Sequence, residues 1–340
     1  MRHPILICAL LSALLAAPGL AGATHVATAG PGATDAQPIP GEAVSGTVVR
    51  VEAKIVPGAA TSATLGTRRS GSGVILDART VLTIGYLVLE ADEVDVTTAA
   101  GVTVPGAVAG YDHASGFGLI RTALPMIGKA AEIGDSDLVA ESQPVFTLGH
   151  GEAEATALRV LSRQPFAGGW EYLLERPILT IPPVNNWSGS ALFTPDGKLV
   201  GVGSLIMADA LPGGGRVPGN LFVPINLLKP IIADLRAHGR SKHPPQPWLG
   251  VTTEVFRGHV VVIRVSRDGP ADNAGISAGD IIIGVGEEAI FGQADLYRRI
   301  WQRGPAGTVI PLRLLRGGEV REVSVASIDR MDFLKRPGGV

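Results

Sequence analysis

Short apolar runs separated by turn-forming residues occupy the sequence from Val44 to about Leu235. The runs are rich in Val, Ile, Leu and Thr, and they include residues 46–55, 73–76, 93–98, 144–148 and 199–204. Gly, Pro, Asn and Asp separate them, which is typical of an all-β barrel or sandwich. One amphipathic helix is predicted to close this region, from Pro224 to Leu235, with Asn226 at its start.

A charged, breaker-rich segment at 238–247 divides the sequence into two modules. It contains almost no apolar side chain, as is usual at a domain boundary. We therefore predict one domain over 44–237, a second over 248–328 and a tail over 329–340. The second domain is predicted to run strand, strand, short helix, strand, helix, strand, strand. A chain of 340 residues, 46% hydrophobic and 18% charged, is long and apolar enough for such packed domains.

Residues 1–23 have the pattern of a secretory signal peptide. A basic N-terminus precedes an apolar run over 4–17, and small residues then lead to a predicted cleavage after Ala23. Cleavage is favoured over anchoring, because the run is short for a membrane span and Pro18 interrupts it. The predicted location is therefore periplasmic or secreted, with membrane attachment only if the signal stays uncleaved. Residues 24–43, rich in Ala, Gly, Pro and Thr, are predicted to form a flexible linker.

The charge balance and the cysteine count restrict the function further. A formal net charge of -2 at pH 7 leaves no excess of basic residues to bind phosphates, so we expect no nucleic-acid partner. The only cysteine, Cys8, lies in the predicted signal peptide, so the mature chain would have no disulfide and no thiol nucleophile. The histidines show no metal-ligand spacing, and we expect neither a metal nor another cofactor.

The second module carries the motifs of a peptide-binding domain. They are WLGV at 248–251, VVV at 260–262, GPADNAGISAGDIII at 269–283 and GQADL at 292–296. These motifs closely resemble the PDZ domains of the HtrA/Deg family, and the resemblance covers the whole module. It implies a C-terminal α+β domain.

Three backbone N–H groups of this module are predicted to bind the terminal carboxylate of a peptide. Leu249, Gly250 and Val251 follow one another at a glycine-containing turn, where successive N–H groups form a concavity that attracts anions. An extended peptide would then add to the strand that begins at Val251. Leu296 and Ile300 lie one helical turn apart and are predicted to line the pocket for the last apolar side chain of the peptide. The alternative is that both are ordinary core residues.

The first module contains segments that resemble the catalytic segments of the same family. They are GSGVILD at 71–77, VLTIGYLV at 81–88, DHASGFGLIR at 112–121 and NWSGSAL at 186–192. Tyr86 stands where the family has its catalytic histidine, Gly116 stands at the aspartate position, and Ser188 falls on the nucleophile. The resemblance implies a mainly β chain with a trypsin-like double β-barrel over the first module. It also implies a serine-protease centre that has lost its base.

A serine hydroxyl needs a neighbouring proton acceptor to attack a carbonyl group. The phenol of Tyr86, with an ordinary pKa of about 10, is protonated at neutral pH, and Gly116 has no side chain to orient a base. Loss of the histidine alone costs serine proteases roughly a millionfold in turnover, so triad proteolysis is not expected. The backbone N–H groups of Asn186 and Ser188 would still form an oxyanion hole if Asn186 adopts a positive φ.

Four other side chains near these segments bear on the same centre. Trp187 either fills the substrate cleft or packs against the barrel, and the sequence favours neither. His113 is predicted to be an exposed loop histidine, His150 to be structural and Lys198 to face solvent. None of the last three is therefore expected to replace the missing base.

These features favour an exported HtrA-like pseudoprotease. In this hypothesis the PDZ domain binds peptides or C-termini of misfolded or partner envelope proteins, in protein quality control or regulation. The alternative is an active serine endopeptidase that uses Ser188 with a non-standard base. A further hypothesis is a regulatory subunit, either as a homotrimer or in an assembly with active paralogues.

Overall fold

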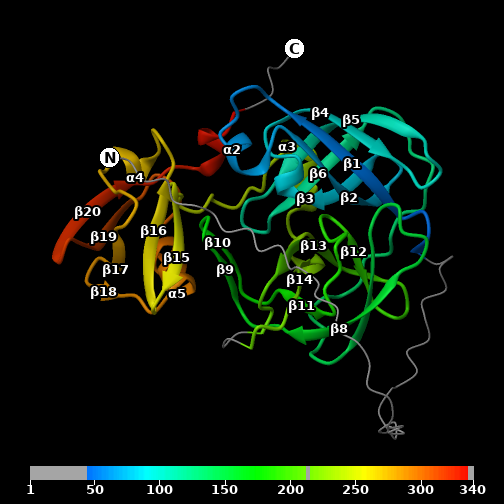
Figure 1. Cartoon of the computed structure of the whole chain (residues 1–340). Helices are drawn as coiled ribbons and strands as arrows, with labels where there is room; N and C mark the ends of the chain where they lie inside the picture. Colours follow the sequence, from blue (N-terminus) through cyan, green and yellow to red (C-terminus); the bar gives the residue numbers. More distant parts are fainter. Residues whose placement is uncertain (1–43, 212–214, 336–340) are drawn as a thin grey trace, which may run out of the picture. The chain divides into compact units, whose positions relative to one another are not determined.

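The computed structural model describes residues 44–211 and 215–335. The predicted signal peptide (1–23) and linker (24–43) lie outside the described residues. Within the described residues, strands predominate and form two closed barrels, a small hairpin and a separate sheet (Figure 1). No helix in these two ranges is long and apolar enough to cross a membrane.

The first closed barrel has the strand order β1-β2-β3-β6-β5-β4. Its strands are Val48–Ile55 (β1), Arg68–Asp77 (β2), Thr80–Ile84 (β3), Ala91–Thr97 (β4), Thr103–Tyr111 (β5) and Phe117–Thr122 (β6). Side chains along β1 alternate between buried and exposed, and those of β3 are all buried. This alternation places one face of a strand inside the barrel, where the apolar side chains pack. The short helices α2 (Ser62–Leu65) and η1 (Gly85–Leu87) lie in its connections.

The second closed barrel has the strand order β11-β14-β13-β12-β7-β8. Its strands are Pro144–Leu148 (β7), Thr156–Ser162 (β8), Ile178–Ile181 (β11), Ala191–Phe193 (β12), Leu199–Met207 (β13) and Gly219–Pro224 (β14). Between β8 and β11 the chain forms a separate two-stranded hairpin from β9 (Phe166–Gly168) and β10 (Tyr172–Leu174). The expected double β-barrel is therefore confirmed, and residues 166–174 are called the β9–β10 hairpin below.

The helix predicted to close the first module is shorter than expected and begins later. The structure has a 3-10 turn, η2 (Ile225–Leu227), followed by α3 (Ile232–His238). Pro230 lies between them, and a proline breaks a helix because it has no N–H to donate and its ring clashes with the preceding turn. Asn226 does not open the helix either, since its side-chain amide donates to the carboxylate of Asp135 at 2.6 Å.

The second module is a sheet of order β15-β16-β17-β19-β20, with β18 paired to β17. Its elements are Val251–Phe256 (β15), His259–Val265 (β16), Pro270–Asn273 (α4), Ile281–Val285 (β17), Glu288–Ala289 (β18), Gln293–Gln302 (α5), Val309–Arg316 (β19) and Glu319–Ala326 (β20). Apart from the short β18, this is the predicted order of strands and helices. The apolar face of α5 covers the sheet and buries Leu296, Tyr297 and Ile300.

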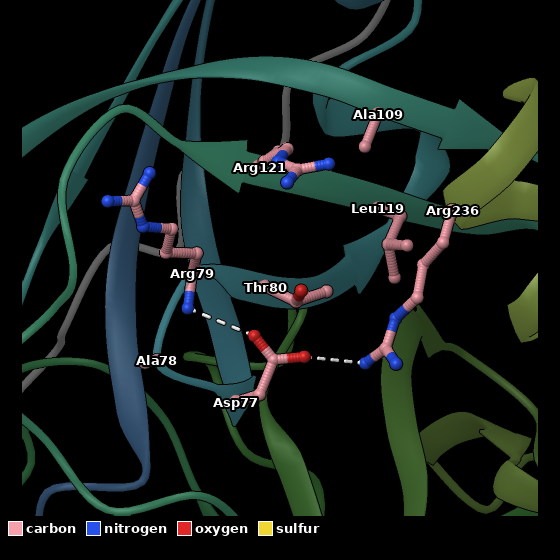
Figure 2. A pocket seen from close by; sticks show the side chains of 8 residues that line it. All are labelled: Asp77, Ala78, Arg79, Thr80, Ala109, Leu119, Arg121 and Arg236. Carbon is pink, nitrogen blue, oxygen red and sulfur yellow. Dashed lines mark hydrogen bonds and ion pairs between the residues drawn. The ribbon is translucent and has the colours of Figure 1, made fainter.

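The segments before and after the second module are both fastened to the first barrel. On the N-terminal side, Arg236 of α3 forms an ion pair with Asp77, at the end of β2, at 2.7 Å (Figure 2). On the C-terminal side, the segment predicted as a tail contains a helix, α6 (Arg330–Phe333). Two residues later, the N–H of Lys335 donates to the carboxylate of Glu90 at 2.8 Å. The module is therefore held at two points.

Candidate active site and peptide groove

The backbone of the turn that carries Ser188 is held against the first barrel. Ser188 lies between β11 and β12, and its carbonyl oxygen accepts a hydrogen bond from the N–H of Ser72 at 2.8 Å. Gly189 has a φ of 74°, and a Cβ at this position would collide with the carbonyl oxygen of Ser72. Only glycine adopts a positive φ easily and also has no Cβ. The position of the Ser188 backbone is therefore fixed relative to β2.

The hydroxyl of Ser188 has a phenol as its neighbour. The Oη atom of Tyr86 lies 2.9 Å from Ser188 Oγ and 2.9 Å from the carbonyl oxygen of Ser204. A carbonyl oxygen only accepts, so the phenol can donate to Ser204 while the hydroxyl of Ser188 donates to the phenol oxygen. Burial raises the pKa of Tyr86 well above its ordinary value, and the hydrogen bond with Ser188 opposes this shift only in part. A neutral phenol cannot take the proton of Ser188.

The space of the missing aspartate is filled from the β9–β10 hairpin. Gly116 has a φ of 80°, and a Cβ at this position would lie 2.8 Å from the phenol oxygen of Tyr172. Tyr172 is held there because its hydroxyl donates to the carbonyl oxygen of Ser115 at 2.6 Å. A carboxylate at position 116 would therefore require Tyr172 to move.

His113 is not the exposed loop histidine that the sequence predicted. Its side chain is partly buried, with Nδ1 at 3.0 Å from Tyr111 Oη and 3.0 Å from Arg330 Nη1. Burial, with a smaller contribution from Arg330, lowers the pKa of His113 well below 6.5, so the imidazole is neutral. The prediction failed because Arg330 lies 217 residues further along the sequence.

The other candidate bases also leave Ser188 without a proton acceptor. The N–H of His150 donates to Ser72 Oγ at 2.9 Å, and its carbonyl oxygen accepts from the side chain of Asn186 at 2.9 Å, which is a structural role. Lys198 is half-buried, and its ammonium group pairs with Asp196 at 3.2 Å, which directs it to other partners than Ser188. Across residues 44–211 and 215–335, Tyr86 is the only side chain hydrogen-bonded to the hydroxyl of Ser188.

The predicted oxyanion hole lacks the backbone conformation on which it was based. Among the described residues, the non-glycine positions with a positive φ do not include Asn186. The oxyanion hole formed by the N–H groups of Asn186 and Ser188 therefore stays a prediction, and the backbone of Asn186 does not support it.

Trp187 lines a cavity of about 340 Å³ together with Tyr86 and Tyr172. The ring of Trp187 lies 6.4 Å from that of Tyr86, centroid to centroid. Of the two alternatives for Trp187, this position supports the substrate cleft. Another cavity, of about 420 Å³, lies beside Asp77 and contains none of the predicted site residues (Figure 2). Over the two described ranges, no group of three or more His, Cys, Asp or Glu side chains could hold a metal ion.

A carboxylate of the same chain occupies the three N–H groups predicted to bind a peptide. The N–H of Leu249 donates to Glu171 Oε2 at 2.8 Å, and those of Gly250 and Val251 donate to Oε1 at 2.7 Å and 3.0 Å. Glu171 directly precedes β10 in the β9–β10 hairpin. Burial raises the pKa of its carboxyl group to about 7, although the three N–H groups act in the opposite direction.

Leu296 and Ile300 are buried members of the second module's core. Of the two alternatives for these residues, the structure shows core packing. Leu249 belongs to the same cluster, and so does Leu173 of β10. The hairpin thus places an apolar side chain in the cluster that was expected to receive the side chain of a peptide. Sequence reasoning missed Glu171, Tyr172 and Leu173, and the only local signal was the glycine pair at 168–169, which is typical of a turn.

Both modules match known protein families. A model of the trypsin-like peptidase domain matches residues 71–202, and a model of the PDZ domain matches residues 247–326. A serine protease Do-like HtrA of Bacillus subtilis (strain 168) is 26% identical over 283 residues, which is 74% of this chain and 61% of that protein. The chain therefore contains a trypsin-like peptidase domain followed by one PDZ domain, and it is similar to HtrA proteins.

Other HtrA relatives are similar over the same part of the chain. The periplasmic serine endoprotease DegP of Salmonella typhimurium (strain LT2) is 28% identical, over 75% of this chain and 56% of that protein. The periplasmic pH-dependent serine endoprotease DegQ of Escherichia coli (strain K12) is 29% identical, over 75% of this chain and 58% of that protein. The chain thus spans only about three-fifths of the length of the curated relatives it matches.

Solved structures agree with the fold. The HtrA-type protease AlgW with a decapeptide superposes with a TM-score of 0.51 at 20% identity, covering 87% of this chain and 98% of that one. A serine endoprotease from Yersinia pestis superposes with a TM-score of 0.51 at 23% identity, covering 85% and 97%. Both support a double barrel followed by a PDZ domain.

Proposed function

We propose that this HtrA-like chain is a pseudoprotease that binds peptides or protein C-termini through its PDZ domain and does not cleave them. The observation that carries the proposal is the contact of 2.9 Å between Ser188 Oγ and the neutral phenol of Tyr86. Serine attack on a carbonyl requires a group that takes the hydroxyl proton and returns it to the leaving amine. A buried phenol already carries its own proton at neutral pH, so it does not take up the proton of Ser188.

The proposed binding activity rests on the turn that begins the PDZ domain. Its N–H groups already hold a carboxylate at 2.7 to 3.0 Å. These are the distances of charge-assisted hydrogen bonds, so the turn has the geometry to receive the terminal carboxylate of a peptide. The strand β15 that follows this turn would pair with the backbone of the peptide.

The predicted signal peptide and the relatives named as periplasmic DegP and DegQ support a location in the periplasm. In this setting the ligands would be C-termini of misfolded or partner envelope proteins, and the role would be protein quality control or regulation. Self-association as a trimer, or assembly with active paralogues, belongs to the same proposal. Light scattering on the mature protein would test self-association.

The test of the catalytic part compares the mature protein with its Ser188→Ala variant. A fluorophosphonate probe and a casein substrate are offered to both. We expect no labelling of position 188 and no cleavage above that of the variant. Labelling and cleavage that both disappear in Ser188→Ala would instead establish the alternative, a serine endopeptidase with a non-standard base.

The test of the binding part uses two versions of one fluorescent decapeptide with an apolar last residue, one ending in a free carboxylate and one amidated. We expect only the free carboxylate to bind, because an amidated end offers the three N–H groups no negative charge. Failure of any peptide or protein to bind the chain would refute this part.

A further inference from the structure

The β9–β10 hairpin meets the PDZ domain through the contacts that an external peptide would make. The carboxylate of Glu171 occupies the N–H groups of 249–251. In addition, the N–H of Thr253 in β15 donates to the carbonyl oxygen of Gly169 at 2.8 Å. Backbone pairing with this strand is the second element of peptide capture by strand addition. The hairpin therefore supplies both a carboxylate and a backbone acceptor.

The turn of the hairpin is fitted closely to this surface. Gly169 has no room for a side chain, because a Cβ there would collide with the carbonyl oxygen of Thr253. The hydroxyl of Tyr297 donates to the carbonyl oxygen of Gly168 at 2.9 Å and lies 3.3 Å from the backbone nitrogen of Glu171. Tyr297 belongs to α5, so the helix that borders the groove binds the hairpin as well.

The backbone of Glu171 adopts a conformation that glutamate rarely takes. Its φ is 61°, in the left-handed region that disfavours residues with a Cβ. A residue stays in this region when its surroundings over-determine it. Glu171 is the last residue of the three-residue loop between the paired Gly168 and Tyr172, where hairpins commonly have this conformation. The turn itself therefore accounts for the φ of Glu171, and it presents the carboxylate to the N–H groups of 249–251.

The next residue of the hairpin is directed at the other site. Tyr172 donates to Ser115, fills the space in front of Gly116 and lines the cavity that also contacts Trp187. Glu171 is the last residue of the loop and Tyr172 is the first residue of β10, so one short segment occupies both places. A movement that withdraws Glu171 from the groove therefore also disturbs Tyr172.

We propose that the β9–β10 hairpin is an internal ligand of the PDZ groove, and that a peptide with a free C-terminal carboxylate binds the full chain only by displacing it. This inference rests on the proposed peptide-binding function, and it adds that the groove is closed when no peptide is bound.

The first experiment measures binding of the free-carboxylate decapeptide to three full-length mature proteins by fluorescence anisotropy. They are the wild type, Glu171→Ala, and the control Glu93→Ala, which removes an exposed glutamate of the first barrel. We expect Glu171→Ala to bind at least about tenfold more tightly than the other two, because a groove that is rarely open weakens the apparent affinity by its open fraction. Equal affinity in all three would overturn the internal ligand and leave the peptide-binding function intact. Binding by none would refute the peptide-binding function.

The second experiment needs no peptide, and its main measurement is made on the wild-type chain. Hydrogen exchange is followed by NMR at the N–H groups of Leu249, Gly250, Val251 and Thr253 in the wild-type chain. Docking predicts protection of all four, and faster exchange in Gly169→Val, whose new side chain cannot fit against Thr253. Free exchange at 249–251 in the wild type would overturn the internal ligand, whatever the peptide titration shows.

Discussion

The turn around Ser188 and the turn at 249–251 differ in what their proposed chemistry requires. Catalysis at Ser188 would need two further side chains, and the chain has Tyr86 and Gly116 at the positions that the resemblance gives for them. Carboxylate binding at 249–251 needs only N–H groups, which every residue except proline provides. Of the two activities, catalysis is therefore the one that a change of side chains removes more easily.

The same hairpin occupies both places, with chemistry suited to each. Glu171 brings a negative charge to three donors, and Tyr172 brings a neutral ring to a space that a charged side chain would have filled. The comparison shows that a place for catalytic side chains can be filled by ordinary packing. A site made of backbone N–H groups still attracts an anion.

The largest effect on activity is expected from restoring a catalytic triad around Ser188. The triple variant Tyr86→His, Gly116→Asp, Tyr172→Ala restores a base and its orienting carboxylate and removes the phenol that stands in the way. A positioned base contributes roughly 10² to 10⁴ in rate, so we expect casein cleavage to rise about a thousandfold over the wild type. The double variant that keeps Tyr172 should gain far less, and Ser188→Ala in the triple background should erase the gain. No gain in the triple variant would show that the backbone of the turn has also lost its catalytic geometry.

The second prediction concerns the stability of the PDZ domain. Leu296 is buried, and replacing it with alanine should lower the free energy of unfolding of the PDZ domain by about 3 kcal/mol, because a cavity remains. Urea unfolding followed by circular dichroism measures this loss. Val255 is 53% exposed, so Val255→Ala should change stability by less than about 0.5 kcal/mol. Similar values for both variants would contradict the core position of Leu296.

The third prediction concerns the pH dependence of the docking of Glu171 on the PDZ domain. Docking raises the pKa of Glu171 from an ordinary 4.5 to about 7, so the docked form takes up a proton in this range. Docking is then strongest below about pH 4.5 and weakens as the pH rises through 7. Protection of the N–H groups of 249–251 from hydrogen exchange, corrected for the intrinsic exchange rate, should therefore fall about tenfold or more from pH 5 to pH 8.

The groups that face the same hairpin do not explain this change. Burial lowers the pKa of His113 well below 6.5 and raises the pKa of Tyr297 far above this range. The same hydrogen-exchange measurement on Glu171→Ala should therefore show little dependence on pH, and an equal slope in this variant would assign the effect to another group.

The smallest expected effect comes from one hydroxyl. Tyr297→Phe removes the donor to the carbonyl oxygen of Gly168 and keeps the ring in the core. A single hydrogen bond contributes about 1 kcal/mol, so docking should weaken and apparent peptide affinity should rise about fivefold. Anisotropy measures this change, and unchanged affinity would mean that Tyr297 serves the core alone.

Much of the fold was predictable because it rests on local pattern. The run at 144–148 became β7 with the same bounds, and the order of elements in the second module followed from its motifs. The helix before the domain boundary was misplaced, although Pro230 was visible in the sequence, because the apolar spacing around it was given more weight. At the barrel site, Tyr86 and Ser188 were assigned from motifs and do lie 2.9 Å apart.

The two contacts that matter most for regulation were not predictable. Glu171 and Leu249 are 78 residues apart, and an isolated glutamate after a tryptophan has no local sign of a partner. The same holds for Arg330, whose contact with His113 turned an expected loop residue into a partly buried one. Such side chains are placed by tertiary packing between modules, which local periodicity does not encode.

The attachments on both sides of the PDZ domain limit how far the hairpin and the groove can separate. With Arg236 held before the domain and Lys335 held after it, a released hairpin stays close to its groove. Tethered partners of this kind meet at an effective concentration on the order of millimolar. A scarce free peptide therefore competes at a disadvantage with the hairpin of the same chain.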